Sequence, residues 1–364
     1  MKIFIILLAL LSFIATAKAG DYKADSAQAH NYLLRAIDSI NTGKFNEAVI
    51  LCDSASILDP HNIAYPYEKA LAFYKLNQID SAITILDSLT KIKTTSDQVY
   101  QMLGNCYDAL GKPDIAIEIY NNGLKKFPDS GRLFMEQGLY YYNQNEISDA
   151  VNKWETGIYH DPSFSNNYYI LSKFYSKSGL SIWSLLYGEI YFSIADNENK
   201  VKELNRLLFN VYEKSFYTKK DSSIIIKFTT MTITSPVKRP DIDLPFEMAY
   251  QSVMEKASDG LLPKDSSRFN IETLYKIREK FIEIWFDEKL NTKFKNVLFD
   301  WHKTLIDYNL FETYTYLLFA EARVEEFNKW VVKDQPKLKK DINELINKYP
   351  FIVDSTHFLQ KYQL

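Results

Sequence analysis

Alanine recurs at intervals of 34 residues in the first half of the chain, at Ala48, Ala82, Ala116 and Ala150. The same interval links a column of small residues and a column of mostly aromatic ones: Ala36, Ala70, Gly104, Gly138 and Ser172, and Tyr32, Pro66, Tyr100, Phe134 and Tyr168. A fixed period in the range of about 20–50 residues is typical of folds in which one small unit stacks on copies of itself. The period therefore predicts a solenoid.

Each period has the pattern of two helices joined by a turn. Bulky residues at helical spacing predict a buried stripe, as at Tyr100, Leu103 and Tyr107. Gly or Asn follows each first helix, because these residues tolerate the left-handed conformation, at Gly43, Asn77, Gly111, Asn145 and Gly179. Proline, which cannot continue a helix, follows most of the second helices in a column that holds Pro60, Thr94, Pro128 and Pro162.

The segment from Val99 to Tyr107, followed by Gly111, Ala116, Tyr120 and Pro128, resembles a tetratricopeptide repeat. The resemblance implies an all-α fold, a right-handed solenoid of about five helical hairpins over residues 29–62, 63–96, 97–130, 131–164 and 165–198. The first and fifth repeats depart from the pattern, as is expected near the ends of an array, at Arg35, Ser39, Ser184 and Asp196. Residues 199–215 keep the first-helix spacing and are predicted to cap the stack.

Residues 1–19 have the pattern of a signal peptide, in which Lys2 precedes an apolar run from Ile3 to Ala15. The 13 residues of this run are too few for a membrane-spanning helix, which needs about 20. Cleavage is expected after Ala19, with Ala17 as the second option, and an uncleaved N-terminal anchor is the alternative. The pattern predicts a bacterial exported protein, located first in the periplasm and otherwise at the cell surface or outside the cell.

The composition changes after Lys220. We expect a solenoid with its cap over 25–215, a linker over 216–244 and a mainly α-helical domain over 245–364. Short strands are predicted in the linker at Ile224–Ile226 and Thr229–Thr234, without an identifiable partner strand. The helices expected in the C-terminal domain are 245–258, 271–288, 291–308, 311–332 and 336–348.

Several functions are disfavoured by charge and by missing motifs. Loss of Lys2 and Lys18 with the signal peptide takes the formal charge from −3 to −5, which argues against nucleic-acid binding. The later sequence has no segment that predicts a membrane span, and neither H-E-x-x-H nor G-x-S-x-G occurs. We therefore expect no catalytic residue, no metal site and no cofactor. Cys52 and Cys106 lie too far apart in the repeat register for a disulfide and are predicted to be buried thiols.

In the tetratricopeptide-repeat family the first helices of the repeats line a concave groove that holds a protein or peptide. The resemblance implies that groove positions of this chain are the partner-binding residues Tyr67, Leu71, Tyr74, Gln101, Asn105, Asp108, Arg132, Met135, Tyr142, Tyr169 and Lys173. Further groove positions are Leu33, Ile37, Ile40, Leu139 and Asn166. The subtype that captures a C-terminal carboxylate has Lys where this chain has Gln101, so a peptide or a folded partner is expected instead.

These observations predict a non-catalytic scaffold or adaptor of the bacterial cell envelope. Two alternatives stay open at this point. Residues 237–364 could hold an enzymatic activity without a recognisable motif, with the repeats presenting its substrate. The protein could instead be a structural envelope component whose groove is filled by its own C-terminal region.

Overall fold

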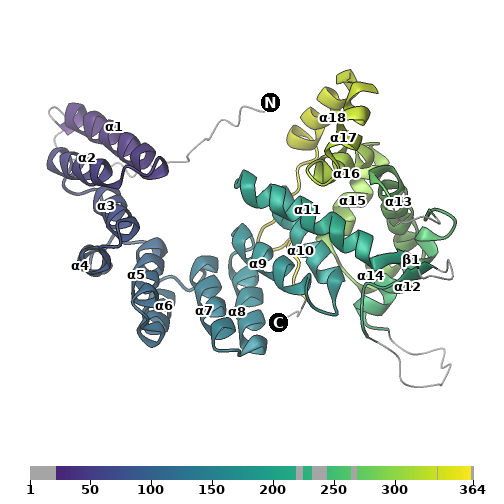
Figure 1. Ribbon diagram of the computed structural model, residues 1–364, viewed down its shortest axis with the longest axis horizontal. Coiled ribbons are helices and arrows are strands. Elements are labelled where there is room, and N and C mark those ends of the chain that lie inside the picture. Colours follow the sequence, from purple (N-terminus) through teal and green to yellow (C-terminus); the bar gives the residue numbers. More distant parts are fainter. Residues whose placement is uncertain (1–21, 219–223, 232–243, 264–268, 334, 362–364) are drawn as a thin grey trace. The chain divides into compact units, whose positions relative to one another are not determined.

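A computed structural model describes residues 22–218, 224–231, 244–263, 269–333 and 335–361. These residues form 18 helices and two short strands (Figure 1). The predicted all-α class, with helical hairpins, a mainly helical C-terminal part and a short β segment, is confirmed. The expected signal peptide lies outside the described residues. Within the described ranges, none of the helices combines the length and hydropathy that crossing a bilayer requires.

The chain divides into two compact units, residues 1–122 and 123–364. The first unit contains five helices that follow the repeat register and most of a sixth. They are α1 (Tyr22–Asn41), α2 (Phe45–Leu58), α3 (Ala64–Lys75), α4 (Ile79–Thr90), α5 (Asp97–Ala109) and α6 (Pro113–Lys126). Successive helices from α1 to α5 pack on one another. The recurring alanines are almost fully buried in this packing, as at Ala48, Ala82 and Ala116.

Four of the five predicted inter-helix turns use the left-handed conformation. Gly43, Asn77, Gly111 and Asn145 have φ values of 78°, 60°, 70° and 63°. Gly179, in the fifth repeat, does not have a positive φ. Its carbonyl oxygen instead accepts a hydrogen bond from the backbone N–H of Thr230, at 2.7 Å. A Cβ added to Gly179 would lie 2.2 Å from Oγ1 of Thr230, so the close approach of this later segment accounts for the glycine.

The column of small residues permits close helix packing, as the sequence predicts. A Cβ added to Gly104 would lie 2.1 Å from Cε1 of Tyr120, and one added to Gly138 would lie 2.2 Å from Nε1 of Trp154. Neither distance leaves room for a methyl group. Cys52 and Cys106 are buried free thiols, as expected, and burial raises the pKa of Cys52 to about 12 and that of Cys106 to about 11.

The second unit begins with the fourth and fifth repeats and a further helix in the predicted capping position: α7 (Gly131–Asn143), α8 (Ile147–His160), α9 (Ser165–Tyr175), α10 (Ser181–Ile194) and α11 (Glu198–Ser215). A two-stranded antiparallel sheet follows, in which β1 (Phe216–Thr218) pairs with β2 (Ile224–Ile226). The partner that the sequence did not identify is thus the segment directly after α11. The expected strand at Thr229 is absent over the described residues 229–231, and its remainder lies outside them.

The remaining helices are α12 (Phe246–Ser258), α13 (Ile271–Asp287), α14 (Leu290–Lys293), α15 (Val297–Asp307), α16 (Phe311–Phe319), α17 (Val324–Lys333) and α18 (Gln335–Asn347). Two long helices expected from the sequence are each divided. The helix expected over 291–308 is interrupted before Asn296, whose side chain caps α15 by accepting from the backbone N–H groups of Leu298 and Phe299. The helix expected over 311–332 is interrupted between Phe319 and Val324.

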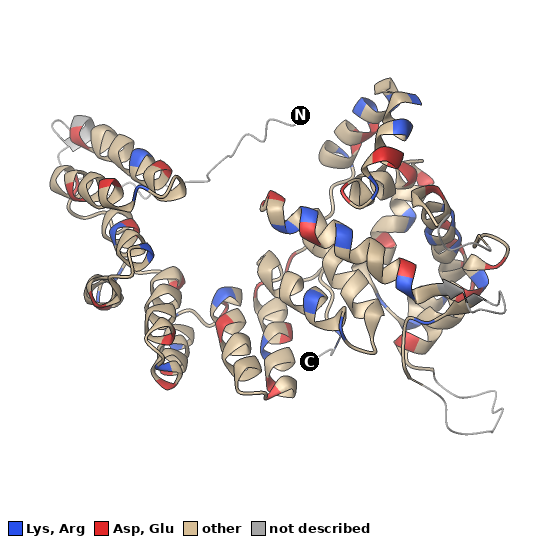
Figure 2. Ribbon diagram, viewed as in Figure 1, with Lys and Arg blue, Asp and Glu red and all other residues tan. Residues whose placement is uncertain are grey.

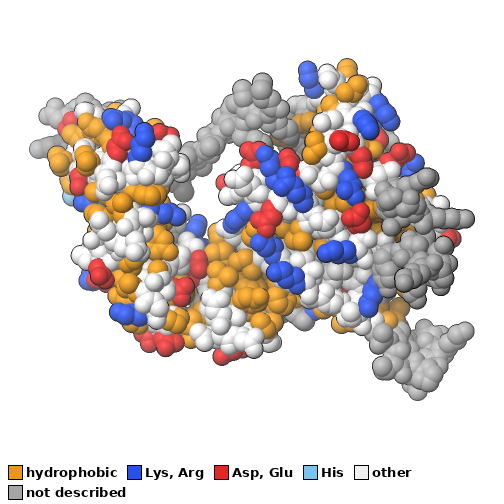
Figure 3. All heavy atoms as spheres, in the orientation of Figure 1, with side chains coloured by type: hydrophobic (Ala, Val, Ile, Leu, Met, Phe, Trp, Pro, Cys, Tyr) orange, Lys and Arg blue, Asp and Glu red, His pale blue; other side chains and the backbone are white. Residues whose placement is uncertain are grey.

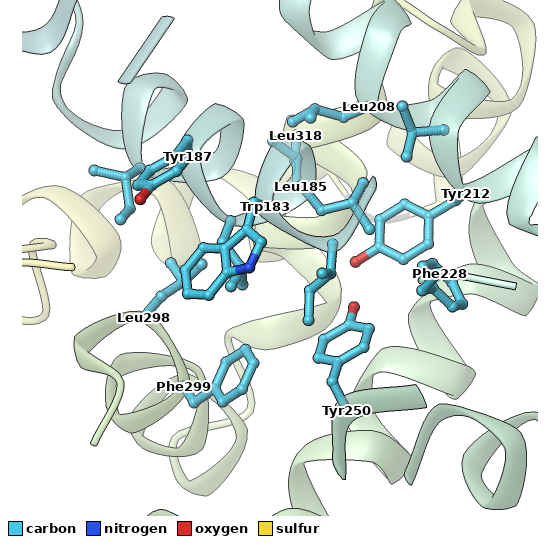
Figure 4. Close-up of a cluster of buried hydrophobic side chains, with 14 of the residues drawn as sticks. Trp183, Leu185, Tyr187, Leu208, Tyr212, Phe228, Tyr250, Leu298, Phe299 and Leu318 are labelled. Carbon is cyan, nitrogen blue, oxygen red and sulfur yellow. The ribbon is translucent and has the colours of Figure 1, made fainter. Parts of the chain in front are cut away.

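A single hydrophobic core joins the last repeats to the C-terminal helices. It includes Trp183 and Tyr187 of α10, Tyr212 of α11, Tyr250 of α12 and Phe299 of α15 (Figure 4). The hydroxyl groups of Tyr212 and Tyr250 point toward one another (Figure 4). The fourth and fifth repeats and the C-terminal helices therefore belong to one compact unit, whereas the two units of the chain divide inside the third repeat.

Candidate protein-binding site

In the first compact unit, the predicted partner-binding residues lie on the first helices α3 and α5. Tyr67, Leu71 and Tyr74 of α3 are half-buried, and both tyrosines pack against the core around Ala70 and Leu86. On α5, Gln101 and Asn105 are half-buried and Asp108 is exposed. The Asn105 side chain accepts a hydrogen bond from the Tyr120 hydroxyl at 2.6 Å. Asn105 thus has a structural contact within its own repeat.

In the fourth repeat, the three predicted residues of α7 differ widely in exposure. The Arg132 guanidinium lies 5.2 Å from the centre of the Phe164 ring. Met135 is only 9 % exposed, so it belongs to the core rather than to a binding surface. Tyr142 is 47 % exposed. Of the three residues, Tyr142 is the one best placed to contact a partner.

The exposed Tyr142 ring is part of an aromatic group. Its centre lies 5.9 Å from that of Trp154 and 6.5 Å from that of Phe174. Hydrophobic side chains gather on the surface over α7–α9 (Figure 3). A partly exposed tyrosine held by neighbouring rings has little conformational freedom to lose when a partner covers it.

The fifth repeat and α11 form a mixed aromatic and charged cluster. The Tyr169 hydroxyl donates to Oε2 of Glu203 at 2.6 Å, and the Lys173 ammonium donates to Oε1 of the same residue at 2.7 Å. The Lys200 ammonium donates to the Asn166 side chain at 2.8 Å and lies 4.8 Å from the centre of the Tyr169 ring. We call these five residues the α9–α11 cluster. Charged residues of both signs lie along α11 (Figure 2).

The contacts of this cluster keep its ion pair charged. The hydrogen bond from Lys173, followed by that from Tyr169, lowers the pKa of Glu203. The hydrogen bond to Glu203 raises the pKa of Lys173. Burial lowers the pKa of Lys200, against the opposing attraction of Glu203. The cluster therefore offers a partner both a fixed anion and fixed cations beside an aromatic ring.

The predicted groove positions do not include Lys200 and Glu203, because the sequence predicts residues 199–215 only as a cap of the stack. The period contained the signal. One step of 34 residues leads from Asn166 to Lys200 and from Tyr169 to Glu203, so both are groove positions of a sixth first helix. The structure brings these positions together with the predicted residues Tyr169 and Lys173.

The described C-terminal tail, residues 351–361, contacts second helices of the repeats. The backbone N–H of Lys361 donates to Oε2 of Glu155 on α8 at 3.0 Å and to the Tyr187 hydroxyl on α10 at 2.7 Å. The Phe358 ring lies 5.9 Å from the ring of Tyr159 on α8. The Lys361 ammonium also lies 6.0 Å from the centre of the Tyr175 ring on α9. None of these contacts involves the α9–α11 cluster.

Ionisable side chains also meet in the C-terminal part, but in the core. Glu189, Arg278 and His302 are each no more than 4 % exposed. The Arg278 guanidinium donates to Glu189 and to the Thr315 hydroxyl, and Nε2 of His302 lies 2.8 Å from Oε1 of Glu189. Within the described residues, no three His, Cys, Asp or Glu side chains are grouped as a metal site. The buried trio ties α10 to α13 and α15.

Comparison with known proteins gives one family and several solved structures. The family model described as "Psidin, N-terminal TPR repeats region" matches residues 33–146. TTC0263, a tetratricopeptide-repeat protein of Thermus thermophilus, is 17 % identical over 50 % of this chain and 99 % of its own, with a TM-score of 0.42. PilF of Pseudomonas aeruginosa is 14 % identical over 52 % of this chain and 87 % of its own, with a TM-score of 0.40.

A crystal structure of MamA is 20 % identical over 43 % of this chain and 91 % of its own, with a TM-score of 0.33. A comparison with curated proteins gives no significant match. The assignment rests on the matched region and on the helix pairs that keep the 34-residue register beyond it. The chain contains a region of tetratricopeptide repeats.

Proposed function

We propose that this protein is a non-catalytic scaffold or adaptor of the bacterial cell envelope, which binds a peptide or a folded protein partner. The partner contacts the first-helix face of the second compact unit, made of the exposed Tyr142 and the α9–α11 cluster. The observation that carries the proposal is the meeting of Tyr169, Lys173 and Glu203 at groove positions of two successive first helices.

The chemistry of this face supports a protein partner. Tyrosine contributes a large contact area with a polar group and is enriched among the residues that dominate binding energy. Tyr169 has two lysine ammonium groups near its ring, at 5.2 Å for Lys173 and 4.8 Å for Lys200. A partner segment that combines an apolar or aromatic side chain with an acidic one would match these groups.

The position of the C-terminal tail also supports the proposal. A protein whose binding face is filled by its own chain cannot present that face to a partner. The described tail instead contacts Glu155 and Tyr187 on second helices. The structural alternative, in which the groove is filled from within, gains no support from these contacts.

The envelope location rests on the signal-peptide pattern of residues 1–19. The mass of the protein purified from a periplasmic extract tests it. Export predicts an N-terminus at Gly20, or at Lys18 if cleavage follows Ala17. An intact N-terminus on protein found in the cytosol would contradict the location and leave the binding face to be tested separately.

Quantitative capture tests the binding function. The protein and a Tyr142→Ala/Tyr169→Ala/Lys173→Ala variant are each used to capture partners from a periplasmic extract, and the captured proteins are compared by mass spectrometry. An Asp149→Ala/Lys153→Ala/Lys177→Ala variant changes three side chains outside the proposed face and is the matched control. The proposal predicts a partner that the protein and the control retain and the first variant loses. Equal capture by all three would refute it.

A further inference from the structure

A second site lies in the C-terminal part of the second unit, away from the α9–α11 cluster. A cavity of about 520 Å³ is bounded by α10, α12, the segment that joins α14 to α15, and the C-terminal tail. Its apolar walls include Trp183, Phe246 and Phe294, and the Phe246 ring lies 5.2 Å from Trp183 and 5.6 Å from Phe294. Small-molecule sites commonly have volumes in the range of about 300–1,000 Å³, with mostly apolar walls and a few polar groups.

The charges that line this cavity are mainly positive. Among the described residues, three lysines line it, Lys293, Lys295 and Lys361, against one carboxylate, Glu247. That carboxylate accepts a hydrogen bond from the Trp183 indole at 2.9 Å and lies 3.9 Å from the Lys361 ammonium. The Lys361 charge is thus offset by Glu247, and the charge of the exposed Lys295 favours an anion.

Asn296 adds an independent observation. It lines the same cavity and is only 3 % exposed. Its Oδ1 is used to cap α15, which fixes Nδ2 as the free end of the amide. In the part of the chain that the structure describes, Nδ2 has no acceptor. A buried N–H donor without an acceptor is destabilising, so an acceptor supplied by a ligand would be favoured at this position.

We propose that this cavity binds a small organic acid, an apolar or planar body that carries one carboxylate. The body lies against Trp183, Phe246 and Phe294. The carboxylate accepts from the Asn296 amide and pairs with the Lys295 ammonium, at the N-terminal end of α15, where the helix dipole also favours an anion. Binding is non-covalent, and this function is independent of the protein-binding face.

Isothermal titration calorimetry of the whole chain with 2-naphthoate, and with the uncharged 2-naphthamide, tests this site. The two probes have the same apolar body and differ in the carboxylate. We expect 2-naphthoate to bind about tenfold more tightly, because hydrogen bonds from Asn296 and Lys295 to a charged carboxylate are stronger than those to a neutral amide. Equal affinities, or no heat of binding for either probe at millimolar concentration, would overturn the proposal.

Three variants separate the site from general charge effects. Lys295→Gln removes an exposed charge and should reduce the preference for 2-naphthoate several-fold. Asn296→Ser keeps a capping oxygen and removes the N–H donor, so it should also reduce the preference for 2-naphthoate several-fold. Lys329→Gln neutralises an exposed lysine of α17 outside the cavity and should leave both affinities unchanged. A Lys295→Gln protein that still prefers 2-naphthoate to the same extent would contradict the assignment. Because Lys295 is exposed, the substitution should not unfold the protein, so a reduced preference would report on binding.

Discussion

The Lys173 ammonium lies 2.7 Å from Oε1 of Glu203, and this ion pair joins the first helix of the fifth repeat to α11. In a repeat protein, matching positions of successive first helices form one continuous surface. The pair shows that α11 continues this surface instead of only ending it. The α9–α11 cluster can therefore be tested as a binding surface, separately from its contribution to folding.

Replacing Glu203 should affect folding only slightly. The side chains of Lys173 and Glu203 are 43 % and 49 % exposed, and exposed ion pairs contribute about 0–1 kcal/mol. We expect Glu203→Gln to lower the free energy of unfolding by less than about 1 kcal/mol in urea denaturation. A much larger loss would show that the cluster is a structural element of the repeat stack.

The small residue in the middle of α7 should be essential for packing. The methyl carbon that Gly138→Ala introduces would lie 2.2 Å from Nε1 of Trp154. Overpacking of this kind typically costs about 1–3 kcal/mol, and we expect the free energy of unfolding to fall by at least that much. Asn143→Ala, at an exposed position of the same helix, is the control and should change it little. Equal stability of the two variants would argue against the close packing of α7 and α8.

The buried trio predicts that acid destabilises the second unit. Burial lowers the pKa of His302 below its ordinary 6.5 despite the attraction of Glu189, so the unfolded chain binds this proton more readily than the folded one. Stability should therefore fall as the pH drops below about 6.5, by at most about 1.4 kcal/mol per pH unit for one proton. His302→Gln should reduce this dependence between pH 7.5 and 5, measured by urea denaturation. An unchanged dependence would exclude His302 as its source.

Glu189 adds a second loss at lower pH. Burial acts to raise its pKa, but Arg278 and His302 outweigh burial and lower it to about 2. Because the folded-state pKa is depressed, the stabilising contribution is complete above about pH 4.5 and is lost as the pH falls toward 2. Thermal unfolding midpoints measured between pH 5 and 2.5 should decline accordingly. A flat profile in this range would contradict the charge assignment of the trio.

Residues 245–364 should not fold without the last repeats. Arg278 is buried against Glu189, which lies on α10 of the fifth repeat. Removal of one partner from a buried ion pair typically costs about 3–5 kcal/mol. A fragment of residues 245–364 should therefore give poorly dispersed amide NMR signals, whereas residues 123–364 should give a folded spectrum. A folded shorter fragment would show that the predicted domain boundary is also a folding boundary.

The repeats could be predicted because the interactions that determine each helix pair lie within one period and recur in the next. Each turn, small residue and buried stripe occurs within one period, so Gly43, Asn77, Gly111 and Asn145 could be recognised as left-handed turns from their spacing. Gly179 fits the same column for a different reason, namely its contact with Thr230, which is 51 residues away in the sequence.

The C-terminal part was harder to predict, because its decisive contacts are not local. Arg278 and Glu189 are 89 residues apart, and Lys361 is 206 residues from Glu155. The sequence predicts one helix over 291–308 because its apolar stripe is continuous. The break before α15 depends on Asn296, whose side chain caps the helix that begins at Val297. Lys200 and Glu203 of the candidate site lie one period beyond the five predicted repeats, so the groove positions of those repeats do not include them.

Site-specific photo-crosslinking tests the central claim most directly. A benzophenone amino acid replaces Tyr142, which is 47 % exposed on α7, or Tyr308, which is 54 % exposed after α15 and serves as the control. Irradiation in the cells that make the protein, followed by mass spectrometry, identifies what lies against each position. We predict a defined protein crosslink at position 142 that is absent at position 308 and is lost when Lys173→Ala is added. Crosslinks that are identical at both positions, or none at position 142, would contradict the proposal that this face binds a protein partner.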